Sequence, residues 1–337
     1  MKVLFIGGTG NISGACTRIA LEKGIELYHL NRGKSGQEVP DGVTTVNADI
    51  KNKSQVLEVL GDRQFDVVVN FIAFTPADIQ RDMEIFSGRT GQYVFISSAS
   101  VYQKKGGHPV ITESTPLYNP FWQYSRDKIA CEEMLNHAYR DRGFPVTIVR
   151  PSHTYDTVIP VAIGGWNDYT IIDRMKKGNK VIIHGDGTSL WTLTHSDDFA
   201  RGFTGLLGHQ QAIGHAFHIT SDELLTWNQI YEAVAEAAGV ALNAVHMASD
   251  YICDFADAAG REAMRGSLLG DKSLSVIFDN SKIKRFVPEF RAVIPFRQGI
   301  ERTLRWFGAD PSRMQITGEN NIFMDRLLEA YRGKGHS

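Results

Sequence analysis

The chain has 337 residues, of which 42% are hydrophobic, and its formal net charge is −2. This length fits one large or two smaller domains with a substantial core, and the near-zero charge excludes the strongly basic surface that binds nucleic acids or anionic membranes. No window contains the roughly 18 consecutive apolar residues of a membrane-spanning helix.

The three cysteines, Cys16, Cys131 and Cys253, lie far apart and match neither a metal-binding spacing nor a disulfide framework. This usage favours a reducing compartment, and the apolar run at the N-terminus is too short for the hydrophobic region of a signal peptide. We therefore expect a cytoplasmic protein with no metal site, no nucleic-acid partner and no membrane attachment.

The chain opens with a short apolar strand, Lys2–Ile6, that runs directly into the glycine-rich turn Gly7–Gly14. Helical apolar spacing follows over Cys16–Glu22, and Glu26–Leu30 predicts a second strand, which completes a βαβ unit. Such a turn lets the backbone approach a diphosphate, and the helix N-terminus directs free N–H groups at it. Ser13 stands where the usual motif has its third glycine. The predicted phosphate-binding residues are Gly7, Thr9, Gly10, Asn11 and Ile12.

Apolar β-rich runs continue to alternate with helical stretches through the first half of the chain. The further predicted strands are Thr44–Asn47, Asp66–Phe71, Gln92–Ser97 and Pro145–Arg150. The helical stretches include Ser54–Leu60 and Pro120–Arg142, which Pro120 opens. This alternation indicates an α/β protein with a Rossmann-type, doubly wound parallel sheet covered on both faces. Ligands of such sheets bind beyond the carboxyl ends of the strands.

The second half of the chain does not continue this regular alternation, and its pattern predicts shorter strands and helices. The predicted elements are the strands Val181–His184 and Ala216–Ile219 and the helices Asp197–Leu207, Trp227–Ala238, Gly299–Trp306 and Ile322–Tyr331. Residues 241–279 are predicted to be irregular. We expect a dinucleotide-binding domain of residues 1–157 and 192–221. Residues 158–191 and 222–337 would form a smaller, discontinuous α+β substrate domain.

A catalytic set is predicted from Ser98, Tyr124 and Lys128. Tyr124 and Lys128 share one face of the Pro120–Arg142 helix, because they are four residues apart. A free phenol with a pKa of about 10 is a poor base, but a neighbouring ammonium together with a positively charged nicotinamide favours the phenolate. Ser98 follows the Gln92–Ser97 strand, where its hydroxyl can hydrogen-bond a substrate alcohol or ketone. The spacing Tyr-x-x-x-Lys alone is weak, and serines after a strand are also ordinary turn formers.

With the phosphate turn, the serine and the Tyr-x-x-x-Lys pair in this order, the chain resembles the extended branch of the short-chain dehydrogenase/reductase superfamily. Within it, the chain is most similar to the NAD-dependent epimerase/dehydratase family, of which UDP-galactose 4-epimerase is a member. The resemblance implies that Asp49 and Ile50 contact the adenine. It also implies that Phe71, Ile72 and Ala73 line the cofactor groove and that Pro151 and His153 lie beside the nicotinamide. Many relatives pair through a helical bundle, so the resemblance also implies a homodimer.

The residues at the end of the second strand leave the choice between NAD and NADP open. An acidic residue at the position of Asn31 would bind the ribose hydroxyls and repel a 2′-phosphate. Asn31 can bind the hydroxyls without that repulsion, and Arg32 and Lys34 can attract a phosphate or simply be solvated. The resemblance to epimerases favours NAD as the cofactor.

Other departures from the family concern the substrate. Sugar dehydratases carry an Asp-Glu pair where Ala99 and Ser100 stand, which argues against dehydration here. Trp191 stands where relatives that act on nucleotide sugars usually have a diphosphate-binding arginine, and an indole cannot replace a bidentate phosphate contact. We expect Trp191 to offer its face to a sugar ring, unless it belongs to the core.

His153, which stands in place of the family's asparagine, is a further polar candidate for the substrate or a buried imidazole. Trp122 and Trp166 are candidates for lining the cavity, but we expect them to serve in core or lid packing. The predicted substrate-binding residues are Ser98, Ser100, Tyr124, His153 and Trp191.

Three functions remain open at this point. The first is a sugar epimerase that inverts a ring hydroxyl, at C4, through a transient keto intermediate and acts on a free pyranose rather than a UDP-sugar. The second is a sugar or alcohol dehydrogenase or reductase, because proton and hydride transfer would use the same residues. The third is a non-catalytic cofactor- or RNA-binding relative, which the absence of a basic surface disfavours.

Overall fold

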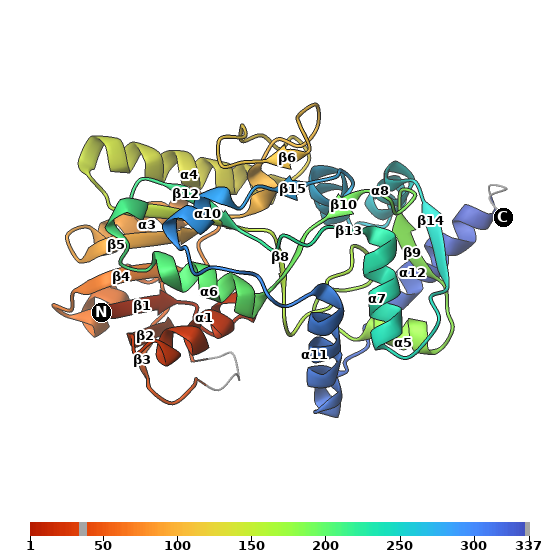
Figure 1. Cartoon of the computed structure of the whole chain (residues 1–337), viewed down its shortest axis with the longest axis horizontal. Helices are drawn as coiled ribbons and strands as arrows, with labels where there is room; N and C mark the ends of the chain where they lie inside the picture. The colour runs from red at the N-terminus through yellow and green to blue at the C-terminus, as the bar shows by residue number, and fades with distance from the viewer. Residues whose placement is uncertain (34–38, 334–337) are drawn as a thin grey trace.

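The computed structural model describes residues 1–33 and 39–333. Lys34 lies outside these residues. A seven-stranded parallel sheet in the order β12-β7-β5-β4-β1-β2-β3 forms one half of the molecule (Figure 1). Its strands are β1 (Lys2–Ile6), β2 (Glu26–Asn31), β3 (Val43–Asn47), β4 (Phe65–Asn70), β5 (Thr90–Ile96), β7 (Val146–Pro151) and β12 (Ala216–Ile219). The predicted doubly wound α/β fold is confirmed.

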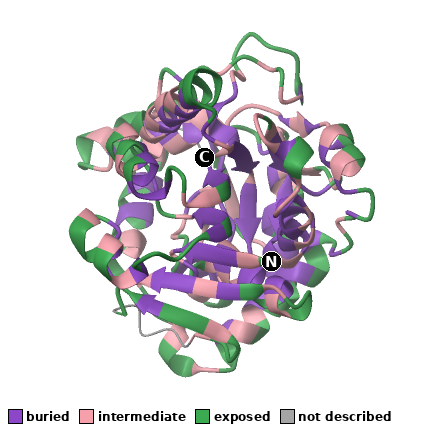
Figure 2. Cartoon of the chain, turned by 90° about the vertical axis from the view of Figure 1, so that its left-hand side faces the viewer, coloured by how far each residue is buried: buried purple, intermediate pink, exposed green. Residues whose placement is uncertain are grey.

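Helices cover both faces of the sheet. One face packs against α1 (Asn11–Glu22), α6 (Ser196–Leu206) and α10 (Ser281–Phe286), and the other against α2 (Lys53–Leu60), α3 (Pro76–Phe86) and α4 (Gln123–Arg142). Side chains alternate between the two cores along each strand. Along β1, Val3 and Phe5 enter the first core, whereas Leu4 and Ile6 enter the second. Figure 2 shows buried residues along the inner strands and exposed residues on the outer elements.

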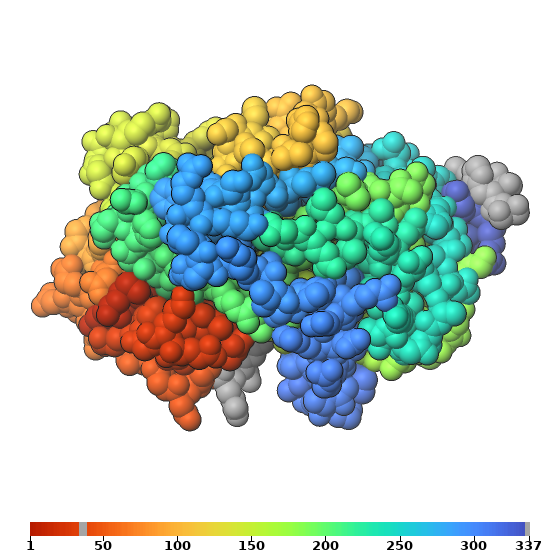
Figure 3. Space-filling view, viewed as in Figure 1, coloured from red at the N-terminus to blue at the C-terminus, as the bar shows by residue number. Residues whose placement is uncertain are grey.

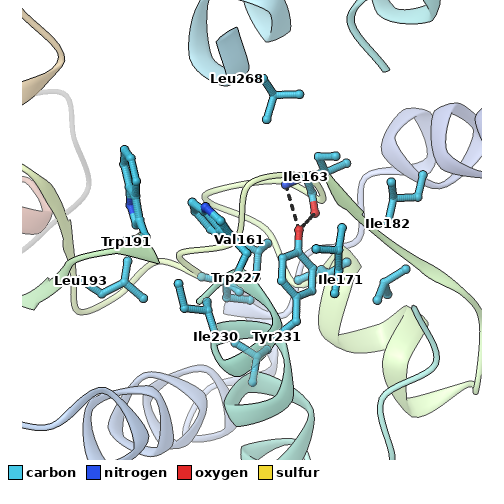
Figure 4. Packing of buried hydrophobic residues seen from close by; sticks show 14 of the residues in the cluster. Val161, Ile163, Ile171, Ile182, Trp191, Leu193, Trp227, Ile230, Tyr231 and Leu268 are labelled. Atoms are coloured by element: carbon cyan, nitrogen blue, oxygen red, sulfur yellow. Dashed lines mark hydrogen bonds between the residues drawn. The ribbon is translucent and has the colours of Figure 1, made fainter. Parts of the chain in front are cut away.

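The other half of the molecule has its own apolar core (Figure 4). Its two-stranded parallel sheet pairs β9 (Val181–His184) with β14 (Ala244–Met247). The helices around it are α5 (Thr170–Lys176), α7 (Trp227–Ala237), α8 (Ser249–Ala258), α9 (Ala263–Ser267), α11 (Phe296–Gly308) and α12 (Gly318–Arg332). Tyr231 lies in the middle of this core, where its hydroxyl bonds the backbone N–H and carbonyl of Ile163 at 3.2 and 3.3 Å.

The prediction that residues 241–279 are irregular is wrong. This stretch contains β14, α8, α9, the π-helix η3 (Leu268–Lys272) and the short strand β15 (Ile277–Phe278). Strand β15 pairs in parallel with β6 (Val110–Ile111). Small and charged residues obscure the helical spacing of α8, whose buried residues are Ile252, Cys253 and Ala256.

Further short strands connect the two halves. Strand β8 (His153–Tyr155) pairs in parallel with β11 (Leu193–His195). Strand β10 (Leu190–Trp191) pairs antiparallel with β13 (Leu225–Thr226).

The connection from α10 to α11 crosses the front of the molecule in Figures 1 and 3. It is held to α6 by the carboxylate of Asp198, which accepts hydrogen bonds from the backbone N–H groups of Val293 and Ile294 at 3.0 and 2.8 Å. Helix α10 packs its Ile283 into the core of the large sheet. The predicted division placed this helix in the second domain, whereas its Ile283 packs with the large sheet; the division into domains stays a prediction. No helix in the described ranges is long and apolar enough to cross a membrane.

Candidate active site

Two adjoining cavities lie beyond the carboxyl ends of the central strands. The outer cavity has a volume of about 770 Å³ and extends from Asn31 past Asp49 to Asp78. The inner cavity has a volume of about 490 Å³ and lies among Ser98, Tyr124 and η3. Gly7, Gly10 and Ile72 line both cavities, which therefore form one extended groove with the shape that a dinucleotide requires.

The glycine-rich turn leads from β1 into α1. Gly7 has a φ of +81°, and a Cβ at Gly8 would overlap the imidazole of His29 on β2, so both positions require glycine. Ser13, in place of the third glycine, is buried, and its hydroxyl accepts a hydrogen bond from the Gly10 N–H at 2.8 Å. The serine thus stabilises the turn at the helix N-terminus instead of weakening it.

Asn31 connects β2 to the glycine turn. Its side-chain carbonyl oxygen accepts a hydrogen bond from the Gly8 N–H at 3.3 Å, which leaves the amide NH₂ group as a donor. Arg32 lines the outer cavity next to it. This end of the groove therefore presents donors and a cation to a ribose.

The loop after β4, which lines the groove between the two cavities, is held by a buried polar group. Asn70 accepts a hydrogen bond from the Ile72 N–H at 2.8 Å and donates to the carboxylate of Asp82 on α3. The hydroxyl of Tyr93 donates to the same carboxylate at 2.6 Å. Burial raises the pKa of Asp82 to about 6, although these hydrogen bonds act in the opposite direction.

Asp82 makes the stability of this region depend on pH. Because its pKa is raised in the folded state, the free energy of unfolding falls as the pH rises from about 4 to about 6. In wild type, the free energy of unfolding should fall by about 2 kcal/mol between about pH 4 and pH 7 because of Asp82, and Asp82→Asn should abolish this fall. Urea unfolding of wild type and variant at both pH values measures this difference. The exposed Asp62→Asn variant is the control, and an unchanged pH dependence in Asp82→Asn would contradict the prediction.

A chain of three serine hydroxyls follows β5. The Ser98 and Ser100 hydroxyls are 2.9 Å apart, and Ser125 on α4 donates to Ser100 at 2.7 Å. The two predicted catalytic residues, Ser98 and Tyr124, both line the inner cavity, where Ser98 lies close enough to influence the pKa of the Tyr124 phenol. Their juxtaposition follows from the topology, because the ends of β5 and α4 meet at the same sheet edge.

The environment of Tyr124 differs from the prediction. Burial raises the pKa of its phenol, the nearby Ser98 hydroxyl acts to lower it, and the charge of Asp271 adds to the rise. Lys128, which was predicted to lower this pKa together with a nicotinamide, directs its ammonium at two main-chain carbonyls. Its Nζ donates to Ala73 and Ile96 at 2.6 and 2.7 Å, and lies 5.7 Å from the Tyr124 ring centroid.

Lys128 is therefore buried below the groove. Its side chain joins the loop after β4 to the end of β5, and burial lowers its pKa to about 8. Neither Lys128 nor Ala73 lines either cavity, and each is at most 1% exposed, so the place of Ala73 in the cofactor groove stays a prediction.

The helix that carries Tyr124 begins at Gln123 rather than at Pro120. The reason is Asn119, whose side-chain oxygen accepts hydrogen bonds from the backbone N–H groups of Phe121 and Trp122 and so forms a separate turn. This turn places Trp122 in the wall of the inner cavity, where we had expected core or lid packing.

Trp191 is part of the core of the second half and does not line the cavity. It packs against Trp227, as Figure 4 shows, and only 1% of it is exposed. The prediction that Trp191 contacts a sugar is therefore wrong. Its indole N–H instead donates to His153 at 3.1 Å. The imidazole of His153 does line the inner cavity, and Trp166 stacks on it at 4.6 Å between ring centroids.

Beneath the inner cavity, Glu132 on α4 and Arg150 on β7 form a buried ion pair. The Arg150 Nη2 and Nε atoms contact the carboxylate at 2.5 and 2.9 Å, and the Ser97 hydroxyl donates to it at 2.5 Å. Burial acts to lower the pKa of Arg150, but the charges and hydrogen bonds of Glu132 and Tyr102 together raise the pKa above its ordinary value. This pair ties the helix of Tyr124 to the strand before His153.

Most of the predicted cofactor contacts line the groove, and some functional candidates were missed. The predicted contacts that line it are Gly7, Thr9, Gly10, Asn11, Ile12, Asn31, Arg32, Asp49, Ile50, Phe71, Ile72, Tyr124, Pro151 and His153. The side-chain amide of Asn11 donates a hydrogen bond to the backbone carbonyl of Thr154. The backbone N–H of Asn11, and not its side chain, is therefore the group that is available to a ligand. Asp271 and Lys272 of η3 were missed as cavity residues, because nothing local in their sequence indicates that this helix lies at the cavity.

The comparisons with known proteins agree with this architecture. The model of the NAD dependent epimerase/dehydratase family matches residues 3–220, and the chain therefore belongs to this family. A solved structure, UDP-glucose 4-epimerase from Bifidobacterium longum in complex with NAD+ and UDP, superposes with a TM-score of 0.73 at 17% identity and covers 93% of this chain and 100% of that one. At this identity, the likeness shows the fold alone.

Two curated relatives extend the range of functions. The chain is 24% identical over 292 residues to 2'-dehydrokanamycin reductase of Streptomyces kanamyceticus, covering 86% of this chain and 80% of that one. It is 26% identical over 253 residues to the chloroplast stem-loop binding protein of 41 kDa b of Arabidopsis thaliana, covering 71% of this chain and 63% of that one. Family and neighbours indicate a NAD-dependent enzyme that catalyses an epimerisation, a dehydration or a reduction.

Proposed function

We propose that this protein is a sugar epimerase that inverts a ring hydroxyl, at C4, with a tightly bound nicotinamide dinucleotide. The observation that carries the proposal is that Tyr124 and Ser98 both line the inner end of a groove that the glycine turn also lines. The residues of the groove fit this cofactor, because Gly7 and Gly8 leave no room for side chains and the first turn of α1 supplies free N–H groups.

Each residue has a definite task in this proposal. When bound, the nicotinamide accepts a hydride and returns it. Tyr124 removes the proton of the substrate hydroxyl and gives it back, and Ser98 hydrogen-bonds the same oxygen so that it stays beside the phenol. Lys128 joins the loop after β4 to the end of β5, which precedes Ser98, and places its positive charge 5.7 Å from the tyrosine ring. It is a positioning residue.

Dehydration fits the cavity less well. Elimination of water needs an acid and a base beside the reacting carbons. Ala99 and Ser100 line the cavity at the relevant positions without a carboxyl group. The one carboxylate among the described lining residues of the inner cavity, Asp271, is paired with Lys104 and Lys272.

The expectation that the substrate is a free pyranose depended on a contact between Trp191 and the sugar. Because Trp191 is buried in the core, this argument no longer applies. NAD is the proposed cofactor, although the donors of Asn31 and Arg32 tolerate a 2′-phosphate. The homodimer likewise stays a prediction.

The test uses the protein as purified. We expect denaturation to release a nicotinamide dinucleotide, which mass spectrometry identifies as NAD or NADP. We also expect NMR to detect inversion of a sugar hydroxyl without added cofactor. Turnover that strictly requires stoichiometric added cofactor would contradict the epimerase.

A second candidate is a reductase, which the relationship to 2'-dehydrokanamycin reductase over 86% of the chain favours. Here the same hydroxyls would protonate a ketone, and reduced cofactor would be consumed. A steady fall in the absorbance of added reduced nicotinamide would select this function. Salt-sensitive binding of RNA, with Tyr124→Phe unchanged, would instead favour the function suggested by the name of the stem-loop binding relative.

A further inference from the structure

The wall of the inner cavity opposite the glycine turn is charged. Asp271 and Lys272 of η3 line it, and their side chains are each 13% exposed. Asp271 forms a salt bridge with Lys104, whose side chain is 4% exposed, and the Lys272 Nζ lies 3.3 Å from the Asp271 carboxylate. Burial acts to raise the pKa of Asp271, but the two lysines hold it below its ordinary value. One carboxylate thus stands between two ammonium groups.

The backbone around Lys272 is held firmly in place. Its carbonyl accepts hydrogen bonds from Trp227 Nε1 at 3.1 Å and lies 3.1 Å from His184 Nε2. The carbonyl of Gly270 accepts from the Asn119 amide at 2.7 Å, and the same amide donates to Ser100 at 2.9 Å. The π-helix is therefore joined to the loop of the catalytic serine. π-helical turns of this kind occur frequently at functional sites.

His153 adds an unused donor to the same cavity. Its Nδ1 accepts the hydrogen bond of Trp191, and burial holds the pKa of the imidazole well below its ordinary value, so the ring is neutral with its proton on Nε2. The residue is only 9% exposed, and in the described part of the chain its Nε2 has no hydrogen-bond partner. A buried donor without an acceptor is costly unless a ligand supplies one.

We infer that this wall binds an anionic group of the substrate, with the Lys272 ammonium as its main ligand and the His153 Nε2–H as a second donor. The two lysines exceed the charge of Asp271 by one, and an anion restores neutrality in a site largely removed from water. A cationic substrate group would meet a carboxylate that is already paired. The group is a carboxylate or a phosphate, and it lies across the cavity from the glycine turn.

This inference rests on the proposed function only in placing the substrate in the inner cavity, so binding is measured without turnover. The probes are glucuronate, glucose 1-phosphate, UDP-glucose and, as the neutral reference, glucose, titrated by calorimetry into the protein as purified. We expect at least one anionic sugar to bind about 10-fold more tightly than glucose. We also expect Lys272→Gln to weaken its binding by about 30-fold and that of glucose by less than about 3-fold. The probe whose binding Lys272→Gln weakens identifies the anionic group: glucuronate reports a carboxylate, glucose 1-phosphate a phosphate and UDP-glucose a diphosphate.

Two variants control for structural damage. Lys272→Arg keeps the charge and should retain most of the affinity, and Lys105→Gln removes a neighbouring exposed charge and should change nothing. The inference would be overturned if glucose and all three anions bound with equal affinity, or if no anion bound at concentrations up to about 10 mM. It would also be overturned if Lys272→Gln weakened the binding of glucose and of the anionic sugars equally. If an anion bound in a Lys272-dependent way but no sugar were inverted, only the proposed epimerase function would be contradicted. If Lys272→Gln inverted a neutral sugar at an unchanged rate, only the proposed anion site would be contradicted.

Discussion

Replacing Tyr124 by phenylalanine should lower kcat by about 10²- to 10⁴-fold, which is the usual contribution of a general acid–base group. The substitution removes only the hydroxyl, and the ring keeps its neighbours Trp122 and Phe74 at centroid distances of 5.0 and 6.4 Å. The fold and the bound cofactor should therefore persist. The measurement is the rate of inversion of the sugar identified by NMR, together with the cofactor content of the purified variant.

The matched control is Tyr118→Phe, which removes the same atom from an exposed tyrosine a few residues away and should leave the rate unchanged. If Tyr124→Phe turned over within a few-fold of wild type while retaining its cofactor, another group would have to move the proton. The assignment of Tyr124, and with it the proposed epimerisation, would then fail.

Replacing Glu132 by glutamine should destabilise the protein by about 3–5 kcal/mol, because it leaves the buried charge of Arg150 without its partner. The pair connects α4 to β7, and Ser97 loses a charged acceptor as well. Urea unfolding, followed by tryptophan fluorescence and circular dichroism, measures the loss as a lower midpoint.

Glu133→Gln provides the control, since it removes an exposed charge from the next position of the same helix and should change the midpoint little. The double variant Glu132→Met with Arg150→Met should recover part of the stability, because no unpaired charge remains. A midpoint for Glu132→Gln equal to that of Glu133→Gln would mean that the ion pair contributes nothing to stability.

The parallel sheet was predictable from sequence, since its strands are continuous apolar runs that turns and amphipathic helices separate. Residues Val3 to Ile6 are all buried, two on each face, which is the pattern that a sheet covered on both faces imposes. The turn Gly7–Gly14 was predictable because a buried strand runs directly into a glycine-rich stretch that a helical pattern follows. The adjacency of Ser98 and Tyr124 follows from parallel strands ending at one edge.

The substrate side of the cavity was not predictable in this way. Trp191 was expected to face the substrate and lies in the core, whereas Trp122 and Trp166 were expected in core or lid packing and line the cavity. The local sequence around a tryptophan does not distinguish a core position from a cavity wall, because the burial of its indole depends on which distant segments cover it. The capping of residues 121 and 122 by Asn119, which moves the helix start and places Trp122, is likewise a contact between side chain and backbone that composition does not indicate.

The sequence by itself determined the doubly wound fold, the glycine-rich turn and the order of the Ser98, Tyr124 and Lys128 set, because each depends on residues close together in the chain or on the periodicity of one element. Only the tertiary structure decided that Lys128 faces the carbonyls of Ala73 and Ile96 and that Lys272 reaches the inner cavity. Such placements depend on contacts between residues far apart in the chain. For example, the indole of Trp227 donates a hydrogen bond to the carbonyl of Lys272. These two residues belong to different elements of the second half, and only folding brings them together.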